Sequence, residues 1–168
     1  MLKTGSKAPD FILTNDKGEE VSLHHILESS PIVLYFYPAD FTPGCTKEAC
    51  SIRDMHDDIL SVGLRVVGIS PQDAASHTKF KEKHNLPFTL LSDPDKVAIK
   101  MYDVDGPFGV GVRRATYLIS QGAKIQAALQ ADVLIGRHSD FIEKAVILRE
   151  TAGMKTSDTE QRHREPDD

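Results

Sequence analysis

One segment of the sequence combines a buried strand, a tight turn and a helix that begins close to a cysteine. Residues 32–37 form a short uninterrupted apolar run, which is typical of a strand buried on both faces of a sheet. A turn at 38–44 follows, and Thr42-Pro43 is a favourable helix start, with the threonine as N-cap. Cys45 then falls in the first turn of the helix, where unpaired backbone N–H groups and the helix dipole stabilise an anion. Because the thiolate is the reactive form of cysteine, this segment indicates sulfur chemistry.

The rest of the chain alternates strand-like and helix-like stretches, which predicts a single layered α/β domain. The first two strands should form an N-terminal β-hairpin. We expect strands at 11–13, 20–23, 32–37, 64–69, 88–91, 115–119 and 124–129, and helices at 42–60, 73–84, 95–102 and 139–150. Beyond Thr151 the sequence is rich in charges and has no apolar repeat. We therefore expect a domain over 1–150 and a disordered tail over 151–168.

Composition excludes several classes of protein. A chain of 168 residues can bury a sizeable core without disulfides, and its net charge of -5 gives no reason to expect nucleic acid or an acidic membrane as partner. No apolar run approaches the roughly 20 residues that span a bilayer, and the N-terminus lacks the apolar segment of a secretory signal. Two cysteines without a disulfide framework favour a reducing compartment, so we expect a cytoplasmic protein. No predicted helix or strand has an obvious exposed apolar face, which favours a monomer.

The two cysteines are five positions apart on the predicted helix. Positions 45, 49, 52, 56 and 59 share one face, so Cys45 should point toward the body of the protein. Cys50 lies about 140° further round the helix, and the two Cα atoms should be about 8.6 Å apart. That separation exceeds the ~7 Å limit for a disulfide. The helix therefore predicts two free thiols at rest, which can bond only after local unwinding.

The motif around Cys45 identifies a family. The pattern Pro38-x3-Thr42-x2-Cys45 resembles the active-site signature of the peroxiredoxins, which are thiol peroxidases on a thioredoxin-like fold. The continuation through Cys50 to Arg53-Asp54 is similar to the bacterioferritin-comigratory, or Q-type, subfamily. Further matches extend from about residue 2 to residue 150 and include Arg114-x-Thr-Tyr-Leu-Ile119. The resemblance implies a thioredoxin-like α/β fold, with a central mixed sheet flanked by helices.

The resemblance also implies a role for each matching residue. Cys45 would be the peroxidatic cysteine that becomes a sulfenic acid, and Cys50 the resolving cysteine that condenses with it. Thr42 would hydrogen-bond the thiolate and the peroxide, Pro38 would shield the sulfur from water, and Arg114 would stabilise the thiolate. Thioredoxin or a similar dithiol would reopen the intramolecular disulfide, with no cofactor or metal ion.

The choice between Arg114 and its neighbour Arg113 depends on strand geometry as well as on the motif. Adjacent strand residues face opposite sides of a sheet, so at most one of the two arginines can face the active site. Arg114 shares a face with Thr116 and matches the family spacing. Nearby, Glu48 fits either a surface charge or an active-site role. Arg53 is expected to pair with Asp54 or Asp57, or to anchor the helix, and not to touch substrate.

Other functions fit the sequence less well. The same cysteine pair could act as a peroxide sensor or relay that passes oxidation to a partner protein. A general thiol–disulfide oxidoreductase usually has Cys-x2-Cys, which is absent. A zinc site of Cys45, Cys50 and His56 lacks the spacing of known sites. The glycine-rich stretch 106–111 lacks the preceding strand and following helix of a dinucleotide-binding fingerprint, so we expect a loop there.

Overall fold

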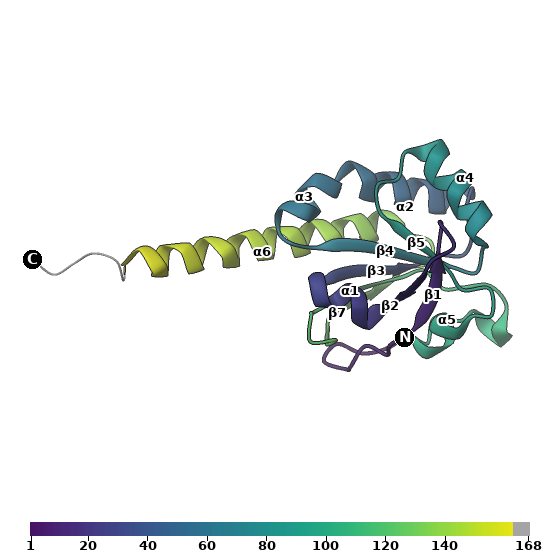
Figure 1. Ribbon diagram of the computed structural model, residues 1–168, viewed down its shortest axis with the longest axis horizontal. Coiled ribbons are helices and arrows are strands. Elements are labelled where there is room, and N and C mark those ends of the chain that lie inside the picture. Colours follow the sequence, from purple (N-terminus) through teal and green to yellow (C-terminus); the bar gives the residue numbers. More distant parts are fainter. Residues whose placement is uncertain (163–168) are drawn as a thin grey trace, which may run out of the picture.

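The computed structural model describes the backbone of residues 1–162 and the side chains of residues 1–153. Within this part of the chain, seven strands form one mixed sheet in the order β2-β1-β5-β4-β3-β6-β7 (Figure 1). The strands are β1 Ile12–Asn15, β2 Glu20–Ser22, β3 Ile32–Phe36, β4 Arg65–Ser70, β5 Thr89–Ser92, β6 Ala115–Ile119 and β7 Ile125–Gln130. The predicted α/β fold with an N-terminal hairpin is confirmed, since β1 and β2 pair antiparallel.

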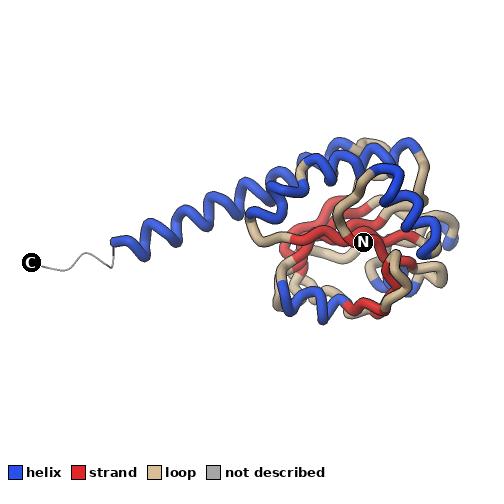
Figure 2. The backbone as a smooth tube through the Cα atoms, turned by 45° about the horizontal axis from the view of Figure 1, so that its top comes forward, coloured by secondary structure: helices blue, strands red, loops and turns tan. Residues whose placement is uncertain are grey.

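Helices cover both faces of the sheet (Figure 2). They are α1 Leu23–Ser29, α2 Pro43–Asp54, α3 His56–Ser61, α4 Ala74–His84, α5 Val97–Met101 and α6 Gly136–Arg162, with a short 3₁₀ turn at Pro107–Gly109. Figure 1 shows α2, α3, α4 and α6 on one side of the sheet and α1 and α5 on the other. No helix within residues 1–162 has the length and apolar character needed to cross a bilayer.

The central strand β3 contributes to two separate cores. All five of its residues are buried, and alternate side chains face opposite sides of the sheet. Ile32, Leu34 and Phe36 pack into the core beneath α1 and α5. Val33 and Tyr35 pack into the other core, together with Cys45, Ala49, Ile52 and Ile59 of α2 and α3. The apolar face predicted for the cysteine helix is therefore the face that packs on the sheet.

The strand directions bring two segments that are distant in the sequence together at one end of the central strands. β3 runs antiparallel to β6, with Phe36 opposite Ala115. The residues that follow β3, from Tyr37 onward, therefore lie beside Arg114, which precedes β6. The turn that leads into α2 starts at this same end of the strands.

Three elements differ from those predicted. The helix expected over 42–60 is broken at Met55, where a backbone φ of −96° and ψ of 2° separates α2 from α3. The apolar periodicity continues across this break and so conceals it. Helix α1 was not predicted; Ser22 caps it by accepting a hydrogen bond from the N–H of His25. Seven residues are too few to show a helical repeat.

The last helix is longer than expected at both ends. α6 runs from Gly136 to Arg162, although the sequence predicted a helix over 139–150 and a disordered tail from 151. Residues 151–162 are helical in the structure, where the sequence predicted a disordered tail, and no proline interrupts the helix there. Residues 163–168 lie outside the described residues.

Candidate active site

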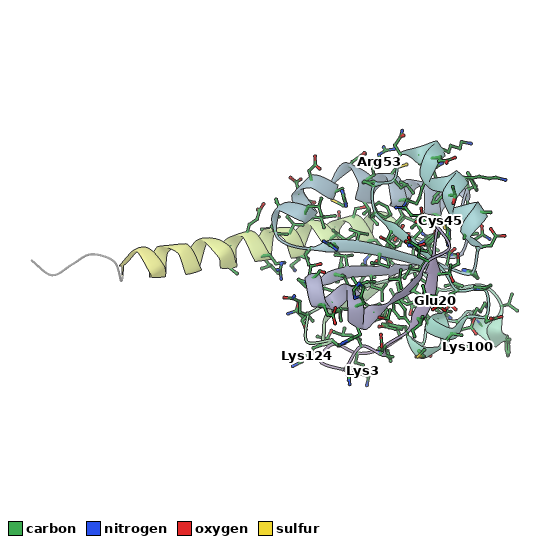
Figure 3. The ribbon with its side chains drawn as sticks, in the orientation of Figure 1. Lys3, Glu20, Cys45, Arg53, Lys100 and Lys124 are labelled. Carbon is green, nitrogen blue, oxygen red and sulfur yellow. The ribbon has the colours of Figure 1, made fainter. Side chains whose placement is uncertain are left out.

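Cys45 lies at the start of α2, beneath the turn that joins β3 to this helix. Its side chain is only 2% exposed. Figure 3 places it at the end of the sheet opposite to the projecting end of α6. The preceding Gly44 allows close packing here, because a Cβ at this position would lie 2.8 Å from Ile135 Cδ1 and 3.3 Å from Arg114 Nη2. Sulfur and guanidinium are thus enclosed in a site with little spare space.

Arg114 is the cation that contacts this sulfur. Its Nη2 lies 3.3 Å from Cys45 Sγ, and its Nη1 donates to the Glu48 carboxylate. The Arg114 side chain is buried, whereas the neighbouring Arg113 is half-exposed and pairs with Asp132 at 3.1 Å. The backbone N–H of Arg114 donates to Asp132 Oδ1 at 2.9 Å, which fixes the start of β6. Of the two arginines, Arg114 is therefore the one that faces the cysteine.

Glu48 lies behind the arginine, one helical turn after Cys45, and is completely buried. Burial raises the pKa of Glu48 to about 7, although the Arg114 guanidinium acts in the opposite direction. Burial would lower the pKa of Arg114, but Glu48 and Cys45 raise it overall. The surface role that the sequence left open for Glu48 is thus excluded.

His138 of α6 completes this buried group. Its Nε2 lies 2.8 Å from the Ala131 carbonyl oxygen, which can only accept, so Nε2 carries a proton. Nδ1 lies 2.8 Å from Thr116 Oγ1, and burial lowers the pKa of this imidazole. His138 is therefore neutral, and its Nδ1 accepts a hydrogen bond from the Thr116 hydroxyl. Its 3.8 Å approach to Glu48 is close packing rather than an ion pair.

Thr42 and Pro38 lie on the turn above the sulfur. Thr42 occupies the N-cap position, as predicted, but its hydroxyl donates to the Ala39 carbonyl oxygen at 3.0 Å. It does not cap the helix, so the N–H groups of the first turn of α2 are not occupied by this side chain. Pro38 is half-buried. It directly follows Tyr37, whose backbone N–H donates to the Ile69 carbonyl oxygen.

Cys50 is not part of this constellation. It lies in the second half of α2, half-buried, and both cysteines are free, as the predicted geometry required. Arg53 lies three residues further on, donates to the His84 carbonyl at 2.8 Å and pairs with Asp54 at 2.9 Å. The second half of α2 is thereby attached to the end of α4.

Sequence reasoning missed two buried polar groups, His138 and the pair Asp40–His77. Each has its partners far away in the chain: Thr116 is 22 positions from His138, and His77 is 37 positions from Asp40. His56 is half-buried against Phe88, with ring centroids 6.1 Å apart. Among the described residues, no three His, Cys, Asp or Glu side chains are grouped as metal ligands would be.

The sequence matches one family over most of its length. The model of the AhpC/TSA family matches residues 4–128. The putative peroxiredoxin bcp of Coxiella burnetii is 45% identical over 132 residues, which are 75% of this chain and 87% of that protein. Peroxiredoxin Bcp of Bacillus subtilis is 43% identical over 130 residues, covering 74% and 82%. Against the chloroplastic peroxiredoxin Q of Oryza sativa subsp. japonica, 46% identical over 126 residues, the match covers 74% of this chain but 58% of the relative.

Solved structures of related proteins have the same fold. The crystal structure of peroxidoxin BcpB from Mycobacterium tuberculosis superposes with a TM-score of 0.82 at 32% identity, covering 88% of this chain and 98% of that one. Peroxiredoxin Q of Xanthomonas campestris gives 0.75 at 27% identity, covering 82% and 90%. Together with the buried cysteine–arginine contact, these matches show that the chain belongs to the AhpC/TSA family, as a peroxiredoxin of the Bcp and Q type.

Proposed function

We propose that this thiol peroxidase reduces hydrogen peroxide and organic hydroperoxides with Cys45 as the attacking thiolate. The observation that carries the assignment is the 3.3 Å contact between Arg114 Nη2 and Cys45 Sγ at a helix start. A neighbouring cation and a helix N-terminus both favour the thiolate over the thiol. The bacterioferritin comigratory protein of Xanthomonas campestris, a homologue of known structure, has alkyl peroxide reduction activity, which supports the organic substrates.

In the first step, the sulfur attacks one peroxide oxygen. An S–O bond forms and the O–O bond breaks; Cys45 is oxidised by two electrons to a sulfenic acid, and the departing oxygen takes up a proton to leave as water or an alcohol. Negative charge moves from sulfur to the leaving oxygen. Arg114 and the first-turn N–H groups of α2 are the donors that stabilise this charge, and the Thr42 hydroxyl joins them when it turns away from the Ala39 carbonyl oxygen. Glu48 holds the guanidinium in place, and Pro38 limits the access of water.

In the second step, Cys50 attacks the sulfenic acid and releases hydroxide, which is protonated to water. The product is a Cys45–Cys50 disulfide, which the intact helix α2 does not permit, because the two Cα atoms are about 8.6 Å apart on regular helix geometry. Residues of α2 between the cysteines must therefore unwind. A dithiol such as thioredoxin then reduces the disulfide by thiol–disulfide exchange and restores both thiols.

The proposal includes the setting in which the protein works. Two free cysteines fit the reducing conditions of the cytoplasm, the compartment we propose. We also propose a monomer. In a monomer, the apolar side chains of Phe108, Val110, Val133 and Leu134 stay exposed to solvent. Light scattering after size-exclusion chromatography should give the mass of one 18.6 kDa chain, and twice that mass would contradict the proposal.

Peroxide consumption coupled to NADPH through thioredoxin and its reductase tests the cycle. Wild type should turn over many times, Cys45→Ser should be inactive, and Cys50→Ser should consume a single equivalent of peroxide. Full turnover by Cys50→Ser would exclude Cys50 as the resolving residue. A wild type that oxidises once and is not recycled by any dithiol reductant would instead fit a peroxide relay.

A further inference from the structure

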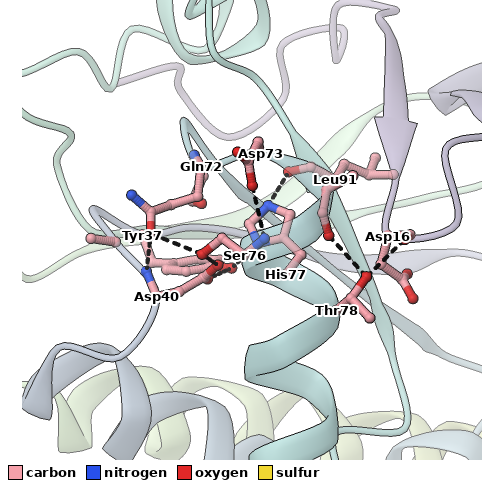
Figure 4. A network of polar contacts seen from close by, with 12 residues as sticks. Asp16, Tyr37, Asp40, Gln72, Asp73, Ser76, His77, Thr78 and Leu91 are labelled. Carbon is pink, nitrogen blue, oxygen red and sulfur yellow. Dashed lines mark hydrogen bonds and ion pairs between the residues drawn. The ribbon is translucent and has the colours of Figure 1, made fainter.

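A second buried polar network lies beneath the active-site turn, and the chemistry described above does not use it (Figure 4). Its centre is Asp40, which belongs to the turn between Pro38 and Cys45 and whose side chain is completely buried. The Asp40 carboxylate accepts hydrogen bonds from the Tyr37 and Ser76 hydroxyls, each at 2.7 Å. The Asp40 backbone N–H donates to Gln72 Oε1 at 3.1 Å. The carboxylate and the N–H of Asp40 are therefore held by Tyr37 just after β3, by Gln72 just before α4 and by Ser76 of α4.

His77 of α4 is the charged partner of Asp40. His77 Nδ1 lies 2.8 Å from Asp40 Oδ2, and its Nε2 lies 3.2 Å from the Leu91 carbonyl oxygen (Figure 4). A carbonyl oxygen and a carboxylate both accept, so both ring nitrogens carry protons and the ring is an imidazolium. Burial would raise the pKa of Asp40, but hydrogen bonds from His77, Tyr37 and Ser76 hold it below its usual range. The two residues form an ion pair whose side chains are both fully buried.

The next residue in the turn has an unfavourable backbone conformation. Phe41 has a φ of 63°, in the left-handed region that large side chains rarely adopt. Its ring packs on Phe80 and His84 of α4, with centroids 5.3 and 6.5 Å away. Such strain persists only where surrounding contacts enforce it. The turn therefore keeps its shape through its attachment to α4.

We propose that the Asp40–His77 ion pair is a positioning element that holds the active-site turn, and with it Cys45, in the conformation that reacts with peroxide. The pair touches neither the sulfur nor the arginine. It acts through the chain between Asp40 and Cys45, which carries Thr42 and the start of α2. Because the same turn must yield when α2 unwinds, the pair also slows formation of the Cys45–Cys50 disulfide. This inference depends on the proposed function.

The test separates the two chemical steps in single-turnover reactions of the full chain. Rapid quenching followed by intact mass spectrometry gives the fractions of thiol, sulfenic acid and disulfide over time, and hence one rate constant for oxidation and one for disulfide formation. Asp40→Asn keeps the shape of the side chain but removes its charge. We expect oxidation to be slower by about tenfold or more, since small displacements of reacting groups carry penalties of this size, and disulfide formation to be faster.

Thr78→Val is the matched control, because Thr78 adjoins His77 on α4 but bonds the Asp16 and Ala74 carbonyls instead of the active-site turn (Figure 4). It should leave both rate constants unchanged. If Asp40→Asn does not fold, as judged by circular dichroism, Ser76→Ala removes one hydrogen bond to the carboxylate. It should shift both rate constants in the same directions, by about threefold.

The proposal requires opposite changes in the two steps. The proposal is overturned if folded Asp40→Asn or Ser76→Ala keeps the wild-type value of either rate constant. It is also overturned if Thr78→Val changes both rate constants as much as Asp40→Asn does. Failure of the wild-type protein to form an oxidised Cys45 would refute the proposed function, and this inference with it. If the wild-type protein is oxidised at Cys45 and forms the disulfide, but Asp40→Asn and Ser76→Ala have the wild-type rate constants for both steps, only this inference is refuted.

Discussion

Arg114 and Cys45, 69 positions apart in the chain, are joined by a 3.3 Å contact from Nη2 to Sγ. The other terminal nitrogen of the same guanidinium donates to Glu48, so one planar group connects the sulfur to a fully buried carboxyl. A planar guanidinium can hold two partners at fixed angles, which the single point charge of lysine cannot. This geometry leads to three predictions, and the attachment of the second half of α2 leads to a fourth.

The first prediction concerns the arginine itself. Arg114→Lys should lower the rate constant for Cys45 oxidation by about a hundredfold, the loss typical of removing one placed donor from a site of developing charge. The adjacent Arg113→Lys is the control, because Arg113 pairs with Asp132 at the surface. Rapid-quench measurement with hydrogen peroxide gives both rates. An Arg114→Lys protein with the wild-type rate would show that positive charge, and not the placement of the guanidinium donors, is what matters.

The second prediction follows from the buried Glu48. Its pKa is raised from 4.5 to about 7, so between these values the folded protein holds a proton that the unfolded chain has lost. The contribution of Glu48 to the free energy of unfolding therefore falls as pH rises through this window. Glu48→Gln lacks the titration, so its stability relative to wild type should increase from pH 4.5 to 7 and stay constant above. Urea denaturation across pH checks this, and a difference that does not vary with pH would contradict it.

The third prediction concerns space beside the sulfur. In Gly44→Ala the new Cβ would lie 2.8 Å from the flexible end of Ile135 and 3.3 Å from Arg114 Nη2. The isoleucine can move away at a small cost in stability, whereas displacement of the guanidinium should slow peroxide oxidation by about tenfold. Gly136→Ala is the control, since nothing lies within 4 Å of that position. A Gly44→Ala protein with the wild-type oxidation rate would show that Arg114 tolerates the shift.

The fourth prediction concerns the second half of α2. Arg53 donates to the His84 carbonyl, and this bond must break when the helix unwinds around Cys50. Arg53→Ala removes a hydrogen bond of about 1 kcal/mol, so disulfide formation should be faster by about fivefold, with oxidation of Cys45 unchanged. Arg65→Ala, at an exposed strand position, is the control. A disulfide rate equal to wild type would mean that this part of α2 stays folded during resolution.

The sequence predicted those parts of the site that depend on local order along the chain. The strand before Pro38, the helix start at Cys45 and the free state of both cysteines follow from apolar runs, turn residues and helix geometry. Arg114 required the family spacing, with the alternation of side chains along a strand as support. For these residues, local pattern and tertiary structure agree.

The remaining features depend on contacts that local patterns do not encode. From the sequence, Asp40 is an ordinary turn residue and His77 is part of a polar helix. Only the packing of α4 against the sheet brings the two side chains within 2.8 Å. Glu48 lies one helical turn from Cys45, and its carboxylate is buried against Arg114, which directly precedes β6. The break at Met55 leaves the apolar repeat intact, so it has no signature in the sequence.

The central claim is that Cys45 is the residue that peroxide oxidises. The most direct measurement treats Cys50→Ser with one equivalent of hydrogen peroxide, traps sulfenic acid with dimedone and locates the adduct by peptide mass spectrometry. We expect a single adduct on Cys45, and much less of it at short reaction times when Arg114 is replaced by lysine. If Cys45 is unlabelled in protein that has consumed its equivalent of peroxide, Cys45 is not the residue that peroxide oxidises.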